Sequence, residues 1–331
     1  MSKKTILLTG CAGFIGSNFV KKIAVPNKEF NFLILDALTY AGHYQNIEKD
    51  IIENDHLSFE RIDLRDNLEV QNLFGRERFS GVIHFAAESH VDNSIKNPNV
   101  FVETNVLGTL NLLNAAIHLG EKDFRFCHVS TDEVYGELTE NEPAFTEDHK
   151  ICPNSPYSAS KASSDLLVRS YSQTFGLDTV ITRCSNNYGP YQFPEKLIPT
   201  MIAKASADEK LPVYGNGRNI RDWIYVDDHN RGVWLAYKNG RSGEVYNLGG
   251  GTELRNIDVV KNILSLMGKS EDLISFVEDR KGHDWRYAIN FSKAKDELGF
   301  DPMISFKEGM EKTIRWYQEN TNWLSDVSKT K

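Results

Sequence analysis

The sequence lacks the features that mark secreted, membrane-spanning and metal-binding proteins. It has only four cysteines, Cys11, Cys127, Cys152 and Cys184, with no C-x-x-C pair, so we expect free thiols in a reducing compartment. The apolar run near the N-terminus is only Ile6-Leu7-Leu8, and no apolar stretch reaches the length of a membrane span. No group of His, Cys and carboxylate residues has metal-ligand spacing, so we expect no metal. These absences predict a cytoplasmic protein.

Positive charge is also in short supply. The 331 residues include 38 Lys and Arg against 46 Asp and Glu, which gives a formal net charge of -8. An acidic chain is poorly suited to nucleic acid or to an anionic membrane surface, so we expect neither as a partner. The length predicts roughly two domains, or one large α/β domain with an appendage.

Short apolar runs alternate with longer amphipathic segments through the first half of the chain. Strands are predicted at 5–9, 32–35, 57–62, 81–86, 124–130 and 179–184, and a helix over 100–119 that ends at Gly120. Strands that are apolar on both faces and alternate with helices are typical of a parallel sheet covered on both sides. The predicted class is therefore α/β, a Rossmann-like doubly wound parallel sheet. Beyond Asn186, prolines and glycines break the alternation, which predicts a smaller, irregular C-terminal substrate domain.

A glycine-rich turn follows the first predicted strand. Gly10, Gly13 and Gly16 allow a tight turn and a close approach to a pyrophosphate, and the helix that starts at Phe14 and Ile15 offers backbone amides to the anion. The spacing is G-x-x-G-x-x-G, which on its own is as typical of any tight strand-to-helix turn.

The ends of the next strands favour a dinucleotide. Asp36 is placed to accept both hydroxyls of an adenosine ribose and to repel a 2′-phosphate, which favours NAD over NADP. Asp63 and Leu64 are predicted to contact the adenine edge, although a helix cap is an alternative for Asp63. Small residues at the fourth strand end, Ala86, Ala87 and Ser89, suit a ribose that passes over the strand. Together with the glycine-rich turn after the first strand, the ends of four consecutive strands therefore favour NAD as the cofactor.

Two groups of residues carry candidate chemistry. Tyr157 and Lys161 are four apart and share one helical face, where an ammonium stabilises a phenolate and lowers its pKa from about 10. Thr131, Asp132 and Glu133 follow a buried strand, and two adjacent carboxyl groups with different pKa values can act as acid and base. Taken alone, the tyrosine and lysine could be a surface pair, and the two acids could cap a turn or face solvent.

Five stretches together resemble a known superfamily, the extended short-chain dehydrogenase/reductases: TGCAGFIG, AAESHVD, STDEVYG, YSASK and RCSNNYGPYQFPEKLIP. Within that superfamily they resemble the dTDP-glucose 4,6-dehydratases, from about residue 4 to about residue 320. The most discriminating part is Thr131-Asp132-Glu133, because the related epimerases usually lack the two acids.

The resemblance implies a reaction and a role for each catalytic residue. Tyr157 takes the proton of the C4 hydroxyl while a hydride passes to NAD, Lys161 keeps Tyr157 ionised, and Thr131 hydrogen-bonds the C4 oxygen. The new ketone acidifies C5, so that Glu133 removes the C5 proton and protonated Asp132 gives its proton to the leaving C6 hydroxyl. The hydride returns to C6, and NAD is regenerated in each turnover. The product is a 4-keto-6-deoxy sugar, and the enzyme class is lyase.

The resemblance also implies further binding residues. Thr104, Tyr157, Lys161 and Asn187 are also assigned to the cofactor, Lys161 through the nicotinamide ribose. The expected substrate contacts are Ser89, Thr131, Asn186, Lys196, Leu197, Pro212, Tyr214, Arg221, Asn256, Arg280 and His283. Relatives often have proline in place of Lys281, so the adjacent loop is expected to be looser. For His90, sugar contact and helix capping are both open.

Domain boundaries and partners follow from these assignments. An NAD-binding domain is predicted over 1–185, to which about 223–248 returns, and a nucleotide-sugar-binding domain over 186–222 and 249–331. The expected substrate is dTDP-glucose, and the resemblance implies a homodimer through helices near 100–119 and 157–175. The alternatives are a sugar-nucleotide C4 epimerase, a UDP-sugar 4,6-dehydratase, or a protein that senses NAD without catalysis.

Overall fold

The computed structural model describes residues 3–121, 123–279 and 282–328. Its centre is a seven-stranded sheet with the order β10-β6-β5-β4-β1-β2-β3, in which every pair of neighbours is parallel. The strands are β1 (Lys4–Thr9), β2 (Phe30–Asp36), β3 (Leu57–Arg61), β4 (Gly81–His84), β5 (Arg125–Thr131), β6 (Asp178–Cys184) and β10 (Glu244–Leu248). The α/β prediction is confirmed, and each of the six predicted strands is present.

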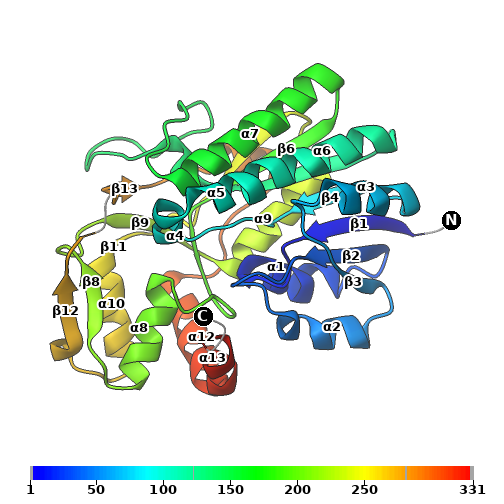
Figure 1. Cartoon of the computed structure of the whole chain (residues 1–331). Helices are drawn as coiled ribbons and strands as arrows, with labels where there is room; N and C mark the ends of the chain where they lie inside the picture. Colours follow the sequence, from blue (N-terminus) through cyan, green and yellow to red (C-terminus); the bar gives the residue numbers. More distant parts are fainter. Residues whose placement is uncertain (1–2, 122, 280–281, 329–331) are drawn as a thin grey trace.

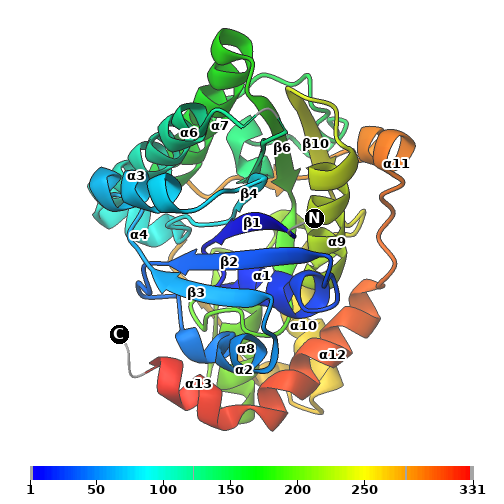
Figure 2. The ribbon, with the colours of Figure 1, turned by 90° about the vertical axis from the view of Figure 1, so that its right-hand side faces the viewer.

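Helices cover both faces of this sheet (Figure 2). One face carries α3 (Asn67–Arg76), α6 (Gly108–Leu119) and α7 (Pro156–Phe175), and the other carries α1 (Phe14–Phe19), η1 (Val20–Ala24), α9 (Val226–Asn239) and α11 (Ser292–Leu298). The strands are apolar on both sides because each side is packed against helices: Ile6, Leu7 and Leu8 of β1 are all fully buried.

A smaller set of elements lies beyond the carboxyl ends of the large sheet (Figure 1). It contains a sheet of β11 (Glu253–Arg255), β9 (Ile220–Tyr225) and β13 (Arg286–Tyr287), with β7 (Asn186–Tyr188) paired to β9, and a separate pair of β8 (Leu211–Tyr214) and β12 (Ile274–Val277). Its helices are α8 (Leu197–Ser206), α10 (Asn256–Leu266), α12 (Phe306–Glu319) and α13 (Thr321–Ser328), which share a core of their own. Between β9 and β11 the chain returns to the large sheet through α9 and β10. The functional division into two domains stays a prediction.

Shorter elements connect these layers. They are η2 (Tyr44–Asn46), α2 (Glu48–Glu53), α4 (Val91–Lys96), α5 (Pro98–Phe101), η3 (Val102–Leu107), η4 (Asp132–Tyr135) and η5 (Glu271–Leu273). The predicted helix over 100–119 is thus interrupted by η3, a stretch of π-helix, before it ends at Gly120 in the left-handed conformation. Wide turns of this kind often occur at functional sites, and Thr104 of η3 faces the pocket described below.

The stretch Pro98–Leu119 is long and apolar enough to cross a membrane, which differs from the sequence-based expectation. Its most apolar window is 44% buried inside the protein, and core helices of soluble proteins pass the same test. Leu112, Leu113, Ala115 and Ala116 pack on the sheet. The signal is therefore weak evidence for a membrane span.

Candidate active site

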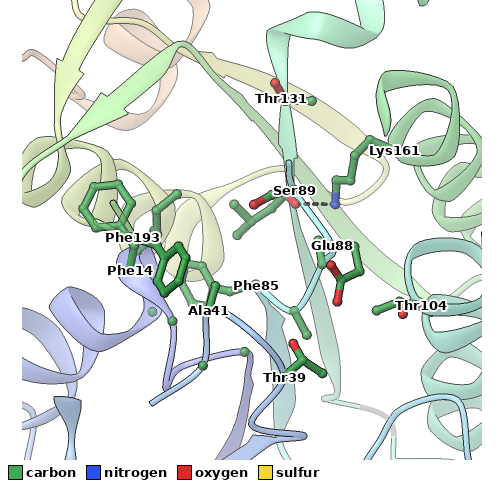
Figure 3. Close-up of a pocket in the computed structure, with 18 of the residues that line it drawn as sticks. Phe14, Thr39, Ala41, Phe85, Glu88, Ser89, Thr104, Thr131, Lys161 and Phe193 are labelled. Atoms are coloured by element: carbon green, nitrogen blue, oxygen red, sulfur yellow. Dashed lines mark hydrogen bonds between the residues drawn. The ribbon is translucent and has the colours of Figure 1, made fainter. Parts of the chain in front are cut away.

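A pocket lies at the carboxyl ends of β1, β2, β4, β5 and β6, where polar residues follow buried strands. It is lined by all of the predicted catalytic residues and all of the predicted cofactor residues: Gly10, Gly13, Phe14, Ile15, Gly16, Asp36, Asp63, Leu64, Ala86, Ala87, Ser89, Thr104, Thr131, Asp132, Glu133, Tyr157, Lys161 and Asn187. Figure 3 shows Lys161 extending into this pocket together with Glu88, Ser89 and Thr104. The sequence thus predicted one continuous site from residues spread over more than half of the chain.

The glycine loop has little room for side chains. Gly10 has a φ of +74°, and a Cβ on it would lie 2.5 Å from the backbone of Ala86. A Cβ on Gly16 would lie 2.5 Å from Cα of Cys11. The loop therefore packs against the end of β4 and leaves its backbone open to the pocket, which fits the pyrophosphate of a dinucleotide.

Asp36 is buried and held by backbone amides. Its Oδ2 accepts a hydrogen bond from N of Ala12 at 2.9 Å, and its Oδ1 accepts one from N of Leu38 at 2.8 Å. Burial raises the pKa of Asp36, and these two hydrogen bonds oppose the rise. Each oxygen accepts one of these hydrogen bonds and has a second lone pair, so the carboxylate is oriented and has the capacity to accept ribose hydroxyls.

Asp63 is paired with a neighbour instead of capping a helix. Arg65 donates from Nε to both carboxylate oxygens, at 3.0 and 2.9 Å, and this pairing lowers the pKa of Asp63. The cap of α3 is Asp66, which accepts from N of Glu69 at 3.0 Å. Asp63 lines the pocket as an ionised group whose charge Arg65 offsets.

The acid pair lies where β5 ends and η4 begins. Thr131 Oγ1 donates to Oδ1 of Asp132 at 3.3 Å and accepts from N of Glu133 at the same distance. Asp132 is buried, and burial, followed by the charges of Glu133 and Asp222, raises its pKa well above the ordinary value. Arg221 partly opposes this rise. The arrangement favours a protonated Asp132 beside Glu133, as an acid and base pair requires.

Tyr157 and Lys161 extend from the first turns of α7. The helix begins with a capping box between Ser155 and Ser158, and Pro156 occupies its first turn. Lys161 Nζ donates to the carbonyl oxygen of Val129 at 2.9 Å, and burial lowers the pKa of Lys161 to about 8. Burial, together with the charge of Glu133, raises the pKa of Tyr157. A cation close to the phenol is therefore needed before Tyr157 can act as a base.

The chain is similar in sequence and in fold to proteins whose activity is known. The family model for GDP-mannose 4,6 dehydratase matches residues 7–313. The dTDP-glucose 4,6-dehydratase of Xanthomonas campestris is 49% identical over 98% of this chain and 95% of its own length, and that of Neisseria meningitidis serogroup B is 46% identical over 98% and 96%. The solved dTDP-glucose 4,6-dehydratase of Streptomyces venezuelae, with NAD and dTDP bound, has a TM-score of 0.92 and 45% identity over 98% of this chain and 99% of its own.

The chain belongs to the dTDP-glucose 4,6-dehydratase family. The resemblance inferred from its motifs is thereby confirmed. The family also accounts for the fold, since the Rossmann-like sheet matches that of the solved relatives.

The predicted substrate residues of this family member divide into two groups. Ser89, Thr131, Asn186 and Lys196 line the pocket, and Lys196 Nζ donates to the carbonyl oxygen of Ser89 at 2.7 Å. Leu197, Pro212, Tyr214, Arg221, Asn256 and His283 lie outside its lining, on the smaller set of elements or beside it. Arg280, a predicted substrate contact, and Lys281, predicted to loosen its loop, lie outside the described residues. The binding roles of all these residues stay predictions.

Arg221, of the second group, is held by residues near β13. It is buried, donates from Nη2 to the carbonyl oxygen of Asp284 at 2.9 Å, and stacks over the ring of Tyr287 at 4.3 Å. Because Arg221 also opposes the rise in the pKa of Asp132, it couples the smaller set of elements to the acid pair.

His90 caps α4 by accepting a hydrogen bond from N of Asn93 at 3.3 Å, which is the capping role left open by the sequence.

Sequence reasoning missed a second wall of the pocket. Tyr40, Glu88, Phe193 and Glu195 line it, and Tyr40 donates to Oε1 of Glu195 at 3.0 Å. Phe193 stacks on the ring of His43 with 5.8 Å between centroids. The sequence QFPEK could have indicated this wall, because Lys196 was assigned to the substrate whereas the neighbouring Glu195 was given no role.

Among the described residues, no group of three or more metal-ligating side chains is found.

Proposed function

We propose that this protein is an NAD-dependent lyase that dehydrates dTDP-glucose to dTDP-4-keto-6-deoxyglucose. The observation that carries the proposal is the placement of Asp132, buried with a raised pKa, beside Glu133 in the pocket that also contains Tyr157 and Lys161. A dehydrogenase or an epimerase needs the tyrosine and lysine, but it does not need a protonated acid next to a second carboxyl group.

Gly10, Gly16 and Asp36 would hold NAD, which would supply the acceptor for a hydride from C4 of the sugar and the donor of that hydride to C6. Tyr157 removes the proton of the C4 hydroxyl, and Thr131 hydrogen-bonds the C4 oxygen. Glu133 then removes the C5 proton, which the neighbouring ketone has acidified, and Asp132 protonates the departing C6 hydroxyl. Glu133 returns a proton to C5 at the end and so recovers its starting state. Tyr157 then still holds the proton of the C4 hydroxyl and Asp132 lacks the proton that left with water, so transfer of one proton from Tyr157 to Asp132 through solvent completes the turnover.

Incubation with dTDP-glucose in heavy water tests this reaction. We expect loss of the 6-hydroxyl and deuterium at C5 of the product, both detected by mass spectrometry and NMR. Inversion at C4 without solvent label would instead identify an epimerase. UDP-glucose and GDP-mannose, assayed in parallel, test the nucleotide preference, and we expect dTDP-glucose to have the highest kcat/KM.

We also propose a cytoplasmic homodimer with neither nucleic acid nor membrane as a partner. The homodimer is supported by a strip of half-exposed apolar side chains on adjacent elements, namely Val102 and Leu107 of η3 and Leu166 of α7. Leu113, by contrast, packs inward on the sheet. The variant Leu107→Asp/Leu166→Asp is expected to be monomeric by light scattering. Ile52→Asp on α2, where the side chain is also exposed, is the matched control and should stay dimeric.

A further inference from the structure

Asp165 continues the catalytic face of α7 by one more turn. Tyr157, Lys161 and Asp165 are spaced four residues apart, which places all three on one side of the helix. Asp165 is only 1% exposed, and a carboxylate is rarely buried to this extent without a partner of opposite charge. It lies deeper than Lys161 and does not line the pocket, so direct contact with substrate is not its role.

Contacts on either side of Asp165 connect it to Lys161. On one side, Arg183 of β6 donates from Nε to Oδ2 at 2.8 Å. On the other side, Oδ1 lies 3.5 Å from Nε2 of His128, and the same nitrogen lies 3.3 Å from Nζ of Lys161. A single imidazole nitrogen therefore stands between the carboxylate and the catalytic ammonium.

The groups around Lys161 differ in their effect on its charge. Asp165 faces it from α7, His84 from β4, His128 from β5 and Cys184 from β6. Tyr157, Asp132 and Glu133 line the same pocket, and Arg183 lies beside His128. Burial lowers the pKa of both histidines, so they are neutral at the pH of catalysis. Burial also lowers the pKa of Lys161, and Asp165 is the first of the groups that oppose this change.

We propose that Asp165, oriented by Arg183, is a positioning residue for Lys161, and that its carboxylate acts across His128 to keep the ammonium charged and directed into the pocket. A neutral His128 has one ring proton, so with Lys161 charged its Nε2 accepts from the ammonium. The competing explanation is that the Asp165 and Arg183 pair only ties α7 to β6. The proposal rests on the proposed function, because it requires Lys161 to act with Tyr157.

The test is the pH dependence of the first hydride transfer, measured as NADH formation in a single turnover of the NAD-loaded enzyme with dTDP-glucose. Asp165→Asn removes the negative charge that raises the pKa of Lys161. Lys161 then loses its proton at lower pH, and we expect the alkaline limb of the profile to move down by about 1 pH unit. An unchanged alkaline limb in a folded, NAD-loaded Asp165→Asn enzyme would overturn the proposal.

The matched control is Asp178→Asn. Asp178 of β6 also accepts from Nε of an arginine, Arg125 of β5, at 2.8 Å, but at the opposite end of these strands. Loss of this pair affects structure alone, so its alkaline limb should stay at the wild-type pH. Because Asp165→Asn leaves Arg183 buried without its partner, Asp165→Asn/Arg183→Gln provides a second variant in which both charges are removed. Loss of the Arg183 cation partly opposes loss of the carboxylate, so a downward shift smaller than that of Asp165→Asn is expected.

A measurement on the unmodified enzyme decides the case if neither variant folds. With ¹⁵N-labelled histidine, and His128 assigned from a His128→Gln spectrum, we expect the Nε2 resonance to change as Lys161 loses its proton. A resonance that stays constant across the alkaline range would overturn the proposal. Failure of the proposed function is recognised separately, because wild-type enzyme would then form no NADH from dTDP-glucose.

Discussion

Thr131 and Asp132 are joined by a hydrogen bond from Oγ1 to Oδ1 of 3.3 Å, and the second oxygen of Asp132 is buried with no hydrogen-bond partner in the described part of the chain. Burial and the neighbouring Glu133 raise the pKa of Asp132, which favours its protonated form. One member of the acid pair is therefore prepared to donate, and the other is left to act as the base.

The variant Asp132→Asn should slow the loss of water without preventing the steps before it. We expect kcat to fall by about 100-fold to 10,000-fold, as is typical when a general acid is removed. Bound NADH should accumulate, and the C5 hydrogen should still exchange with heavy water. Rapid quench with mass spectrometry measures water loss, and a wild-type rate of water loss would exclude Asp132 as the acid.

The variant Glu133→Gln should stop the reaction one step earlier. NADH should still form, because the chemistry at C4 depends on Tyr157, but deuterium should not enter C5. NMR of the quenched sugar measures the exchange. Glu140→Gln, at an exposed position on the loop after η4, is the control and should exchange normally. Normal exchange in Glu133→Gln would assign the C5 base elsewhere.

The variant Tyr157→Phe should abolish NADH formation while leaving cofactor binding intact. Removal of the phenol oxygen takes away the group that accepts the C4 hydroxyl proton, so we expect at least about a 100-fold loss in the first step. Stopped-flow absorbance of NADH gives the rate. Tyr171→Phe on the same helix, whose hydroxyl bonds Asn114, should react at the wild-type rate.

The variant Gly10→Ala should lose both NAD and stability. The added Cβ would lie 2.5 Å from the backbone of Ala86, and the φ of +74° is strained for alanine. We expect loss of about 1–3 kcal/mol in the free energy of unfolding and a reduced NAD content after purification. Gly75→Ala is the control, because an added Cβ there has nothing within 4 Å and the residue is inside α3. That variant should be as stable as the wild type or slightly more stable.

The buried histidine His84 should make the protein sensitive to acid. It hydrogen-bonds Thr9 and Thr109, and burial lowers its pKa from 6.5 to about 3. The unfolded chain therefore binds a proton that the folded chain does not, and stability is full above pH 6.5 and falls as pH drops toward 3. This group alone can account for up to about 5 kcal/mol over that window.

The variant His84→Gln checks this account, since glutamine can bond both threonines without titrating. Its free energy of unfolding, from chemical denaturation between neutral pH and about pH 5, should fall less steeply than that of the wild type. An equal slope in the two proteins would mean that other groups carry the acid sensitivity.

Much of the site could be predicted because its signals are local. The strand ends at Asp36 and Thr131, the glycine loop, and the four-residue spacing of Tyr157 and Lys161 are each written in a short stretch of chain. Parallel strands bring their carboxyl ends to one edge, so a correct assignment of strands also predicted that these residues meet. The π-helical interruption at Val102–Leu107 was not predicted, because apolar spacing alone does not distinguish it from a regular helix.

The sequence by itself determined the fold class, the family and the candidate catalytic residues, since periodicity and motif spacing are properties of neighbouring residues. Tertiary structure alone decided which groups are buried and which distant residues meet. The contact of Tyr40 with Glu195 joins positions 155 residues apart, and His128 meets Asp165 only because β5 lies beside α7. Desolvation and opposite charge act through space, so the protonation of Asp132 and the surroundings of Lys161 became visible only in the folded chain.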